Sequence, residues 1–216
     1  MPAVRSSTEI SGAIELGGIA FSGSRIRFSQ NEEIFGECEA AEHVYRVVSG
    51  AVRTMRFSSE GKRQVLGFHL PGDVFGVELS DAYALTAEAV SDVELVVVRR
   101  SVLDKSAAES SAVALAILNL INADLTAARE HAMMLGKKGA SERVAAFLLS
   151  IAQRAGAGAD VELPMSRTDI ADFLGLTIES VSRAFTEMTR QHAIGLPSAR
   201  HVVMRSRSAL EERIAA

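Results

Sequence analysis

The strongest constraint on the fold is the segment Pro164–Gln191, which reads PMSRTDIADFLGLTIESVSRAFTEMTRQ. Apolar residues recur at spacings of three and four on both sides of Gly175, which predicts two short amphipathic helices joined by a turn. Ser166 and Asp169 are placed to cap the first helix, with Asp in the position usually held by Glu or Gln. Glycine accepts the left-handed conformation that ends a helix, and Thr177 is a natural cap for the second. The segment therefore predicts a helix-turn-helix.

The second predicted helix has one apolar face and one polar face. Its inward residues are Val181, Phe185 and Met188, and its outward residues are Glu179, Ser182, Arg183 and Thr186. In a helix-turn-helix the second helix enters the major groove of DNA with its N-terminal residues foremost. Arginine can pair bidentately with guanine, and glutamate can accept from the amino group of cytosine. The alternative is an ordinary helical hairpin with a solvated face, and periodicity alone does not separate the two.

Charge is distributed unevenly along the chain. The net charge of the 216 residues is −4, but residues 137–207 hold 10 Lys/Arg and 7 Asp/Glu, a local net of +3. Binding to phosphate requires only such a local excess. Hydrophobic residues make up 48% and charged residues 23% of the chain, as in soluble globular proteins. No uninterrupted apolar run reaches the roughly 18 residues of a membrane span, and the first residues lack a signal core. We therefore expect a cytoplasmic protein that does not bind a membrane.

The N-terminal half carries the pattern of a β-rich domain. Residues 1–22 are expected to form a lead that is mobile in part. Strand-like runs then occupy residues 44–48, 51–57, 63–70 and 93–98, separated by turn residues at 49–50, 58–61 and 71–73. Closely spaced strands of this kind favour an antiparallel barrel or a jelly roll.

A long helical stretch is expected from about Ala108 to Leu135. A coiled-coil-like stripe steps along it by three and four, and its members are Leu118, Ile121, Leu125, Ala128, Ala132 and Leu135. The stripe can pack against the chain's own barrel or against a second copy. We expect a hinge at residues 137–139, a helix at 141–155, a loop at 156–160 and a small hairpin wing at 194–205.

Five segments together resemble the CRP/FNR family of bacterial transcription regulators, and its FNR/FixK branch in particular. They are VSGAVRT at 48–54, GFHLPGDVFG at 67–76, ERVAAFLL at 142–149, LPMSRTDI at 163–170 and FLGLTIESVSR at 173–183. The resemblance extends from about residue 25 to about residue 205. It implies an α+β fold with a cyclic-nucleotide-binding-type antiparallel jelly-roll barrel in residues 1–107. A dimerisation helix in residues 108–136 and a winged helix-turn-helix in residues 137–216 would follow.

The resemblance also implies a DNA target. The FNR branch carries Glu-x-x-Ser-Arg in its recognition helix, whereas the cyclic-AMP branch carries Arg-Glu-x-x-Gly-Arg; Ile178 and Ser182 place this chain in the FNR type. The implied site is a TTGA…TCAA inverted repeat in double-stranded DNA, bound by a homodimer. The implied base-reading residues are Glu179, Ser182, Arg183 and Ile178, and Ile178 can meet a thymine methyl group. The expected phosphate contacts are Arg167, Thr177, Thr186 and Arg200.

RNA polymerase is a further partner that the resemblance implies, because family members activate transcription. Candidate contact loops are residues 58–62 and 155–160. Both segments have the composition of plain solvent-exposed turns as well, and the sequence does not separate these interpretations.

Effectors known in the family fit this sequence poorly. Residues 64–98 contain no Lys or Arg to hold a cyclic nucleotide phosphate, and Glu78, Asp81 and Glu88 would repel it. An iron–sulfur cluster needs several thiolates, but Cys38 is the only cysteine, and two flanking glutamates disfavour its thiolate. The histidines, His43, His69, His131, His192 and His201, show no ligand spacing. We expect no cofactor, no metal and no enzymatic activity. A sensor with an unidentified ligand in the barrel remains the alternative, ahead of a cupin-like metalloenzyme.

Overall fold

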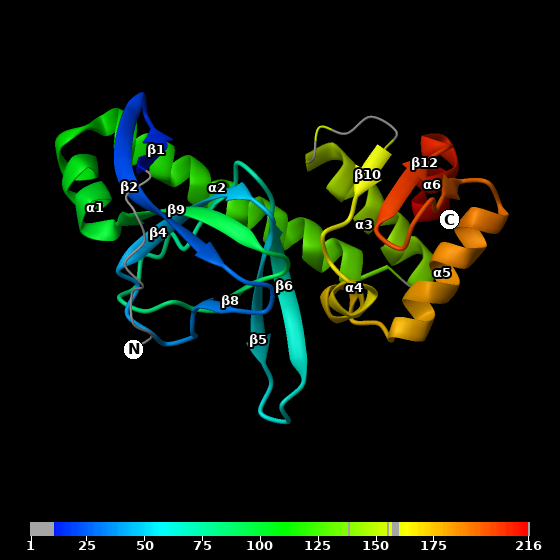
Figure 1. The fold of residues 1–216 in the computed structure, drawn as a ribbon. Helices are drawn as coiled ribbons and strands as arrows, with labels where there is room; N and C mark the ends of the chain where they lie inside the picture. The colour runs from blue at the N-terminus through cyan, green and yellow to red at the C-terminus, as the bar shows by residue number, and fades with distance from the viewer. Residues whose placement is uncertain (1–10, 138, 155, 157–159, 216) are drawn as a thin grey trace. The chain divides into compact units, whose positions relative to one another are not determined.

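The computed structural model describes residues 11–137, 139–154, 156 and 160–215. These residues form two compact units (Figure 1). The first unit comprises the described residues up to Met55 together with Phe68–Thr126. The second comprises Arg56–Gly67 and the described residues from Ala127 onward. The two units are described separately.

Two antiparallel sheets form the β-rich part of the chain, in the cyclic-nucleotide-binding jelly-roll arrangement that the sequence predicted. The strand orders are β1-β2-β9-β4-β7 and β3-β8-β5-β6. The strand bounds are β1 Ser11–Leu16, β2 Ile19–Phe28, β3 Glu33–Phe35, β4 His43–Ser49, β5 Val52–Phe57, β6 Arg63–His69, β7 Val74–Phe75, β8 Thr86–Ala89 and β9 Val93–Arg99. The strands expected at 44–48, 51–57, 63–70 and 93–98 therefore correspond to β4, β5, β6 and β9.

The sequence predicted only a partly mobile lead over residues 1–22, whereas residues 11–22 form β1, its turn and the start of β2; residues 1–10 lie outside the described residues. Strand β1 pairs antiparallel with β2, with Leu16 opposite Ile19. Gly17 and Gly18 form the connection, both with positive φ (59° and 79°), which suits a tight hairpin between right-twisted strands. Ile14 and Phe21 lie opposite each other and are buried. Their contacts stabilise a hairpin whose Ser- and Gly-rich composition gave little strand signal.

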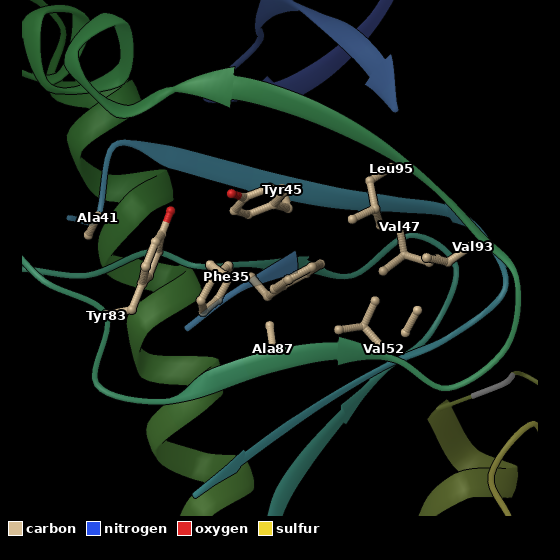
Figure 2. Packing of buried hydrophobic residues seen from close by; sticks show 11 residues of the cluster. Phe35, Ala41, Tyr45, Val47, Val52, Tyr83, Ala87, Val93 and Leu95 are labelled. Carbon is tan, nitrogen blue, oxygen red and sulfur yellow. The ribbon is translucent and has the colours of Figure 1, made fainter. Parts of the chain in front are cut away.

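Alternation along the strands divides the apolar residues between two clusters. Val47 and Leu95 belong to the cluster between the sheets, which includes Phe35, Tyr45, Phe75 and Tyr83 (Figure 2). Val44 and Val96 lie in the same two strands but face the other side of the sheet, and they belong to the second cluster. Val113, from the long helix that follows, completes this second cluster and is fully buried.

Two helices follow the strands where the sequence predicted one. Helix α1 spans Arg100–Glu109 and helix α2 spans Ser111–Leu135. Ser110 separates them because its backbone is extended (φ −134°, ψ 112°), and its hydroxyl accepts from the amide of Val113. The first helix thus begins eight residues before the expected start at 108.

One side of α2 is packed and the other is not. Ile117 and Leu120 pack against the second cluster, whereas Leu115, Leu118, Leu125 and Met133 are exposed. The helix is long and apolar enough to cross a membrane by length and composition, with a mean hydropathy of 1.5 over its most apolar 18-residue window. Its apolar residues are interrupted by polar ones, so the sequence shows no uninterrupted apolar run of that length.

The second unit contains four helices and three short strands among its described residues from 127 onward, besides the end of α2. They are α3 Ala140–Arg154, β10 Asp160–Glu162, α4 Arg167–Leu174, α5 Ile178–Arg190, β11 Ile194–Gly195, β12 His201–Met204 and α6 Arg207–Ala215. The strands form an antiparallel sheet in the order β10-β12-β11, so the expected wing is present with an additional strand. Strand β10 begins at Asp160, within the expected loop 156–160, and residues 157–159 lie outside the described residues. Helix α6 was not predicted.

Candidate nucleic-acid interface

Helix α4 begins with the predicted cap. The hydroxyl of Ser166 accepts from the amide of Asp169 at 3.1 Å, and the carboxylate of Asp169 accepts from the amide of Ser166 at 3.0 Å. Both halves of a capping box are therefore present, with Asp in place of Glu. The helix ends at Gly175, which has left-handed backbone angles (φ 61°, ψ 40°) and donates its amide hydrogen to the carbonyl of Ala171.

Helix α5 begins at Ile178, three residues after Gly175. The hydroxyl of Thr177 accepts from the amide of Ser180 at 3.2 Å, so Thr177 is the predicted N-cap. Val181, Phe185 and Met188 are at most 2% exposed and form the inward face. The local sequence thus determines where both helices begin and which side of α5 remains outside.

The outward side of α5 presents the predicted base-reading residues to solvent. Glu179, Ser182 and Arg183 are exposed, and Ile178 is 44% exposed. Hydrogen bonds from its own backbone amide and from the Thr177 hydroxyl, with the nearby charge of Arg183, lower the pKa of the Glu179 carboxyl. An ionised glutamate and an arginine therefore stand one turn apart on an exposed helix start.

The predicted phosphate contacts have different environments. Arg167, the first residue of α4, is partly buried, and its guanidinium lies 3.3 Å from the centroid of the Phe185 ring. Burial lowers the pKa of Arg167 to about 10, so this group is still protonated at neutral pH. Its position at a helix N-terminus suits an anion. Thr177 and Arg200 are exposed. The hydroxyl of Thr186 donates to the Ser182 carbonyl at 3.0 Å, which leaves it as an acceptor.

Two further residues, which the sequence reading did not connect with this site, support the turn. The last carbonyls of α4 have no partner within the helix. The Phe173 carbonyl accepts from Nε2 of His131 at 2.6 Å, and the Leu174 carbonyl accepts from Nη1 of Arg143 at 2.9 Å. His131 lies in α2 and Arg143 in α3. Because these contacts join residues 31 to 42 positions apart, no local pattern in the sequence indicated them.

The interior between the β-sheets is filled by side chains. Phe35 stacks on Tyr83 with ring centroids 3.7 Å apart, and Tyr45 stacks on Phe75 at 5.2 Å (Figure 2). Arg53 alternates with the interior residue Val52, so it lies on the opposite face of the sheet, where it is 4% exposed. The sequence reading treated Glu88 as a free negative charge; instead, it forms an ion pair with Arg53 at 2.8 Å.

A pocket of about 510 Å³ lies on the surface of the first unit. Its lining carries both signs of charge, from Arg99 and Arg100 and from Glu42, Asp81 and Asp104. Within it, Nε of Arg100 lies 3.4 Å from the Asp104 carboxylate. A mixed lining of this kind does not select an anion such as a cyclic nucleotide. In the part of the chain that the structure describes, no group of three or more His, Cys, Asp or Glu residues could hold a metal ion.

These features define a class of protein. A capped helix–turn–helix with an exposed Glu–Ser–Arg face, followed by a small antiparallel wing, is the architecture of a winged helix-turn-helix DNA-binding domain. It is joined in one chain to a cyclic-nucleotide-binding-type jelly roll.

Comparison with known proteins places the chain in a family. The profile of the Crp-like helix-turn-helix domain matches residues 142–213, and that of the cyclic nucleotide-binding domain matches residues 25–110. The nitrogen fixation regulation protein FixK of Azorhizobium caulinodans is 49% identical over 197 residues, covering 89% of this chain and 79% of that protein. FixK of Rhizobium meliloti is 38% identical over 189 residues, covering 87% and 86%. The structure of FixK2 from Bradyrhizobium japonicum matches with a TM-score of 0.87 and 44% identity, covering 90% of this chain and 98% of that one. The chain belongs to the CRP/FNR family of transcription regulators, in its FixK-type branch.

Proposed function

We propose that this regulator is a homodimeric transcription activator that binds TTGA…TCAA inverted repeats and requires no small-molecule effector. The observation that carries the proposal is the exposed face of α5, where Glu179, Ser182 and Arg183 share one side of a helix start. Arg183 and Glu179 together fit a G·C pair, and Ile178 fits a thymine methyl group. Arg167, Thr177 and Arg200 would set the register on the phosphates, and Thr186 would join them by turning its hydroxyl hydrogen from the Ser182 carbonyl to a phosphate.

Dimerisation is supported by the unpacked side of α2. Leu118 and Leu125 are 60% and 46% exposed in the single chain, and Leu115 extends the same stripe at 59%. The small residues Ala128 and Ala132 continue it and would permit close approach of a second helix. Lipid is the other apolar environment that such a helix fits, but Arg129 and Glu130 are exposed on it, and burying charges in lipid is costly. A second copy would place two recognition helices roughly 34 Å apart, the spacing of an inverted repeat.

Independence from an effector is supported by the space between the sheets. The buried cluster with Phe35, Tyr45, Phe75 and Tyr83 lies there, and the buried cation Arg53, on the opposite face of its sheet, is paired with Glu88. We propose no enzymatic reaction, a cytoplasmic location with the bacterial DNA, and contact with RNA polymerase through the exposed turn at residues 58–62. The other loop considered for this contact, residues 155–160, lies mostly outside the described residues. The alternative is a sensor of the same fold with an unidentified ligand in the barrel.

A gel-shift titration tests the proposal directly. The purified protein is titrated onto a duplex with TTGA…TCAA and onto a duplex with one half-site scrambled, each with and without cyclic AMP. We expect tight binding to the intact repeat alone and no change with the nucleotide. Equal binding to both duplexes would count against recognition of the repeat, and binding only with cyclic AMP would favour the sensor.

A further inference from the structure

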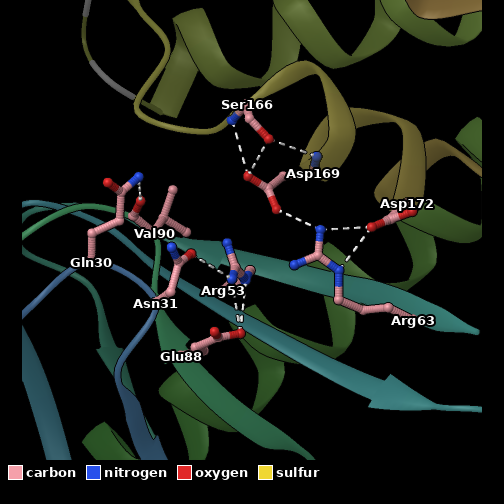
Figure 3. A network of polar contacts seen from close by, with 9 residues as sticks. All are labelled: Gln30, Asn31, Arg53, Arg63, Glu88, Val90, Ser166, Asp169 and Asp172. Atoms are coloured by element: carbon pink, nitrogen blue, oxygen red, sulfur yellow. Dashed lines mark hydrogen bonds and ion pairs between the residues drawn. The ribbon is translucent and has the colours of Figure 1, made fainter. Parts of the chain in front are cut away.

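Arg63, the first residue of β6, contacts two carboxylates of α4, the first helix of the helix-turn-helix (Figure 3). Its Nε lies 2.8 Å and its Nη2 2.7 Å from the same Asp172 oxygen. The Nη2 atom also lies 2.8 Å from Oδ1 of Asp169. Residues 56–67 group with the C-terminal unit, so these contacts lie within one unit. A single guanidinium thus joins two residues on one face of α4.

The Asp169 carboxylate is the centre of this network. Asp169 is 4% exposed. Its other oxygen accepts from the amide of Ser166 at 3.0 Å and from the Ser166 hydroxyl at 2.7 Å, which is the capping box of α4. A buried carboxylate that loses a charged partner is costly. Arg63 therefore supplies the charged partner of the carboxylate that completes the capping box of α4.

The guanidinium of Arg63 keeps its positive charge in this contact. Burial lowers the pKa of the Arg63 guanidinium, but hydrogen bonds and charges from Asp172 and Asp169 together raise it above the ordinary arginine value. Without Arg63, the first two turns of α4 would present the negative charges of Asp169 and Asp172 without this cation between them. That end carries Arg167, and negative charge beside it opposes the approach of DNA phosphate.

We propose that Arg63 is a positioning residue for DNA binding, which holds the N-terminal turn of α4 through Asp169 and Asp172 and neutralises both carboxylates. The inference rests on the proposed function for its DNA readout. The contacts of its Nε and Nη2 groups with the carboxylates indicate that Arg63 acts through α4, and the salt dependence described below tests this against direct phosphate contact. Lys62, the neighbouring residue, is exposed and serves as a matched control for DNA binding, since its removal deletes the same charge one position away and RNA polymerase, its proposed partner, is absent from the assay.

Fluorescence anisotropy with the TTGA…TCAA duplex tests the proposal on Arg63→Gln, Arg63→Lys, Asp172→Asn, Lys62→Gln and the double variant Arg63→Gln/Asp172→Asn. We expect Arg63→Gln to weaken binding about tenfold and Lys62→Gln less than about twofold. Arg63→Lys should retain part of the affinity. The double variant should bind more tightly than Arg63→Gln alone, because one uncompensated carboxylate has been removed.

The salt dependence separates positioning from direct phosphate contact. Because the proposed homodimer carries the substitution in both subunits, loss of one phosphate contact per subunit reduces the slope of log K against log salt by about 1.8, at about 0.9 per contact. An unchanged slope for Arg63→Gln supports a positioning role, and a slope reduced by that amount overturns it. Affinity within twofold of wild type, or no rescue in the double variant, also overturns it.

Hydrogen exchange measured without DNA tests whether Arg63 holds α4, independently of the proposed DNA binding. In Arg63→Gln the amides of residues 163–176 should exchange faster than in wild type, and in Lys62→Gln they should not. If wild type fails to bind the duplex, the proposed function fails, while this measurement still decides whether Arg63 holds α4. If Arg63→Gln does not fold, Asp172→Asn tests the same contact from the helix side, and unchanged exchange there overturns the inference.

Discussion

The imidazole of His131 stacks on the ring of Phe173, with centroids 3.9 Å apart and planes 5° from parallel, while its Nε2 donates to the Phe173 carbonyl at 2.6 Å. One side chain of α2 thus provides both an apolar contact and a polar contact to the end of α4. His131 is 6% exposed. The residue links the long helix to the turn that precedes the recognition helix.

His131 predicts a pH-dependent stability. Burial lowers the pKa of its imidazole, and this outweighs the opposite effect of the hydrogen bond to Phe173. Between the lowered folded pKa and the unfolded value of about 6.5, the unfolded chain binds more protons than the folded one. The contribution of neutral His131 is therefore complete above about pH 6.5 and is lost as the pH falls toward the folded pKa. Urea unfolding at pH 7.5 and at pH 5.5 measures this loss of stability.

The matched variants are His131→Gln, which keeps a donor but does not titrate, and His192→Gln at an exposed position. We expect the loss of stability on acidification to be smaller in His131→Gln than in wild type and unchanged in His192→Gln. The same loss in His131→Gln and wild type would show that another group titrates.

Replacing Arg183 with Ala should remove a base contact from each half-site. The expected loss is about 1–3 kcal/mol per contact, with the largest change when the G·C pair of the half-site is intact. Arg190→Ala is the control, because Arg190 lies at the far end of the same helix and pairs with Glu187. Anisotropy titration measures both variants, and equal losses would indicate that Arg183 contributes only charge.

Charge placed in the exposed stripe of α2 should separate the dimer. Leu118→Asp with Leu125→Asp buries two carboxylates in the proposed interface, and we expect sedimentation velocity to show a monomer where wild type is a dimer. Asn119→Asp adds charge at an exposed position one residue outside the stripe and should leave the dimer intact. A wild-type monomer at micromolar concentration would contradict the pairing.

Gly175→Ala should destabilise the helix-turn-helix by backbone strain alone. The φ of Gly175 is 61°, yet the nearest atoms to an added Cβ are 3.7 Å away, in Arg143 and Leu135, so no clash is introduced. The left-handed conformation costs an L-residue about 1–2 kcal/mol, and Gly175→Asn should cost less. Gly136→Ala, where φ is not positive, is the comparison in chemical denaturation. Equal effects at both glycines would argue against strain.

The helix-turn-helix was predictable because its signals are local. The cap at Ser166, the stop at Gly175 and the inward face of α5 each depend on residues within one or two turns, and the structure contains all three. The strands β4 and β9 were also found, since their runs of valine are strong local signals.

The supports of the site depend on contacts between distant residues and could not be predicted in this way. Arg63 lies 106 positions from Asp169, and His131 lies 42 positions from Phe173. In the sequence, Arg63 is a residue beside a turn and His131 is a histidine without ligand spacing. The first hairpin was missed because its glycines and serines give weak strand propensity, and only the burial of Ile14 against its neighbours reveals it.

Nuclease footprinting of the purified protein on a TTGA…TCAA duplex, without any added small molecule, decides whether the dimer recognises both halves of the repeat unaided. We expect protection of both half-sites at the same protein concentration, with protection lost in Arg183→Ala. Protection of a single half-site, or protection that appears only after a ligand is added, would contradict it.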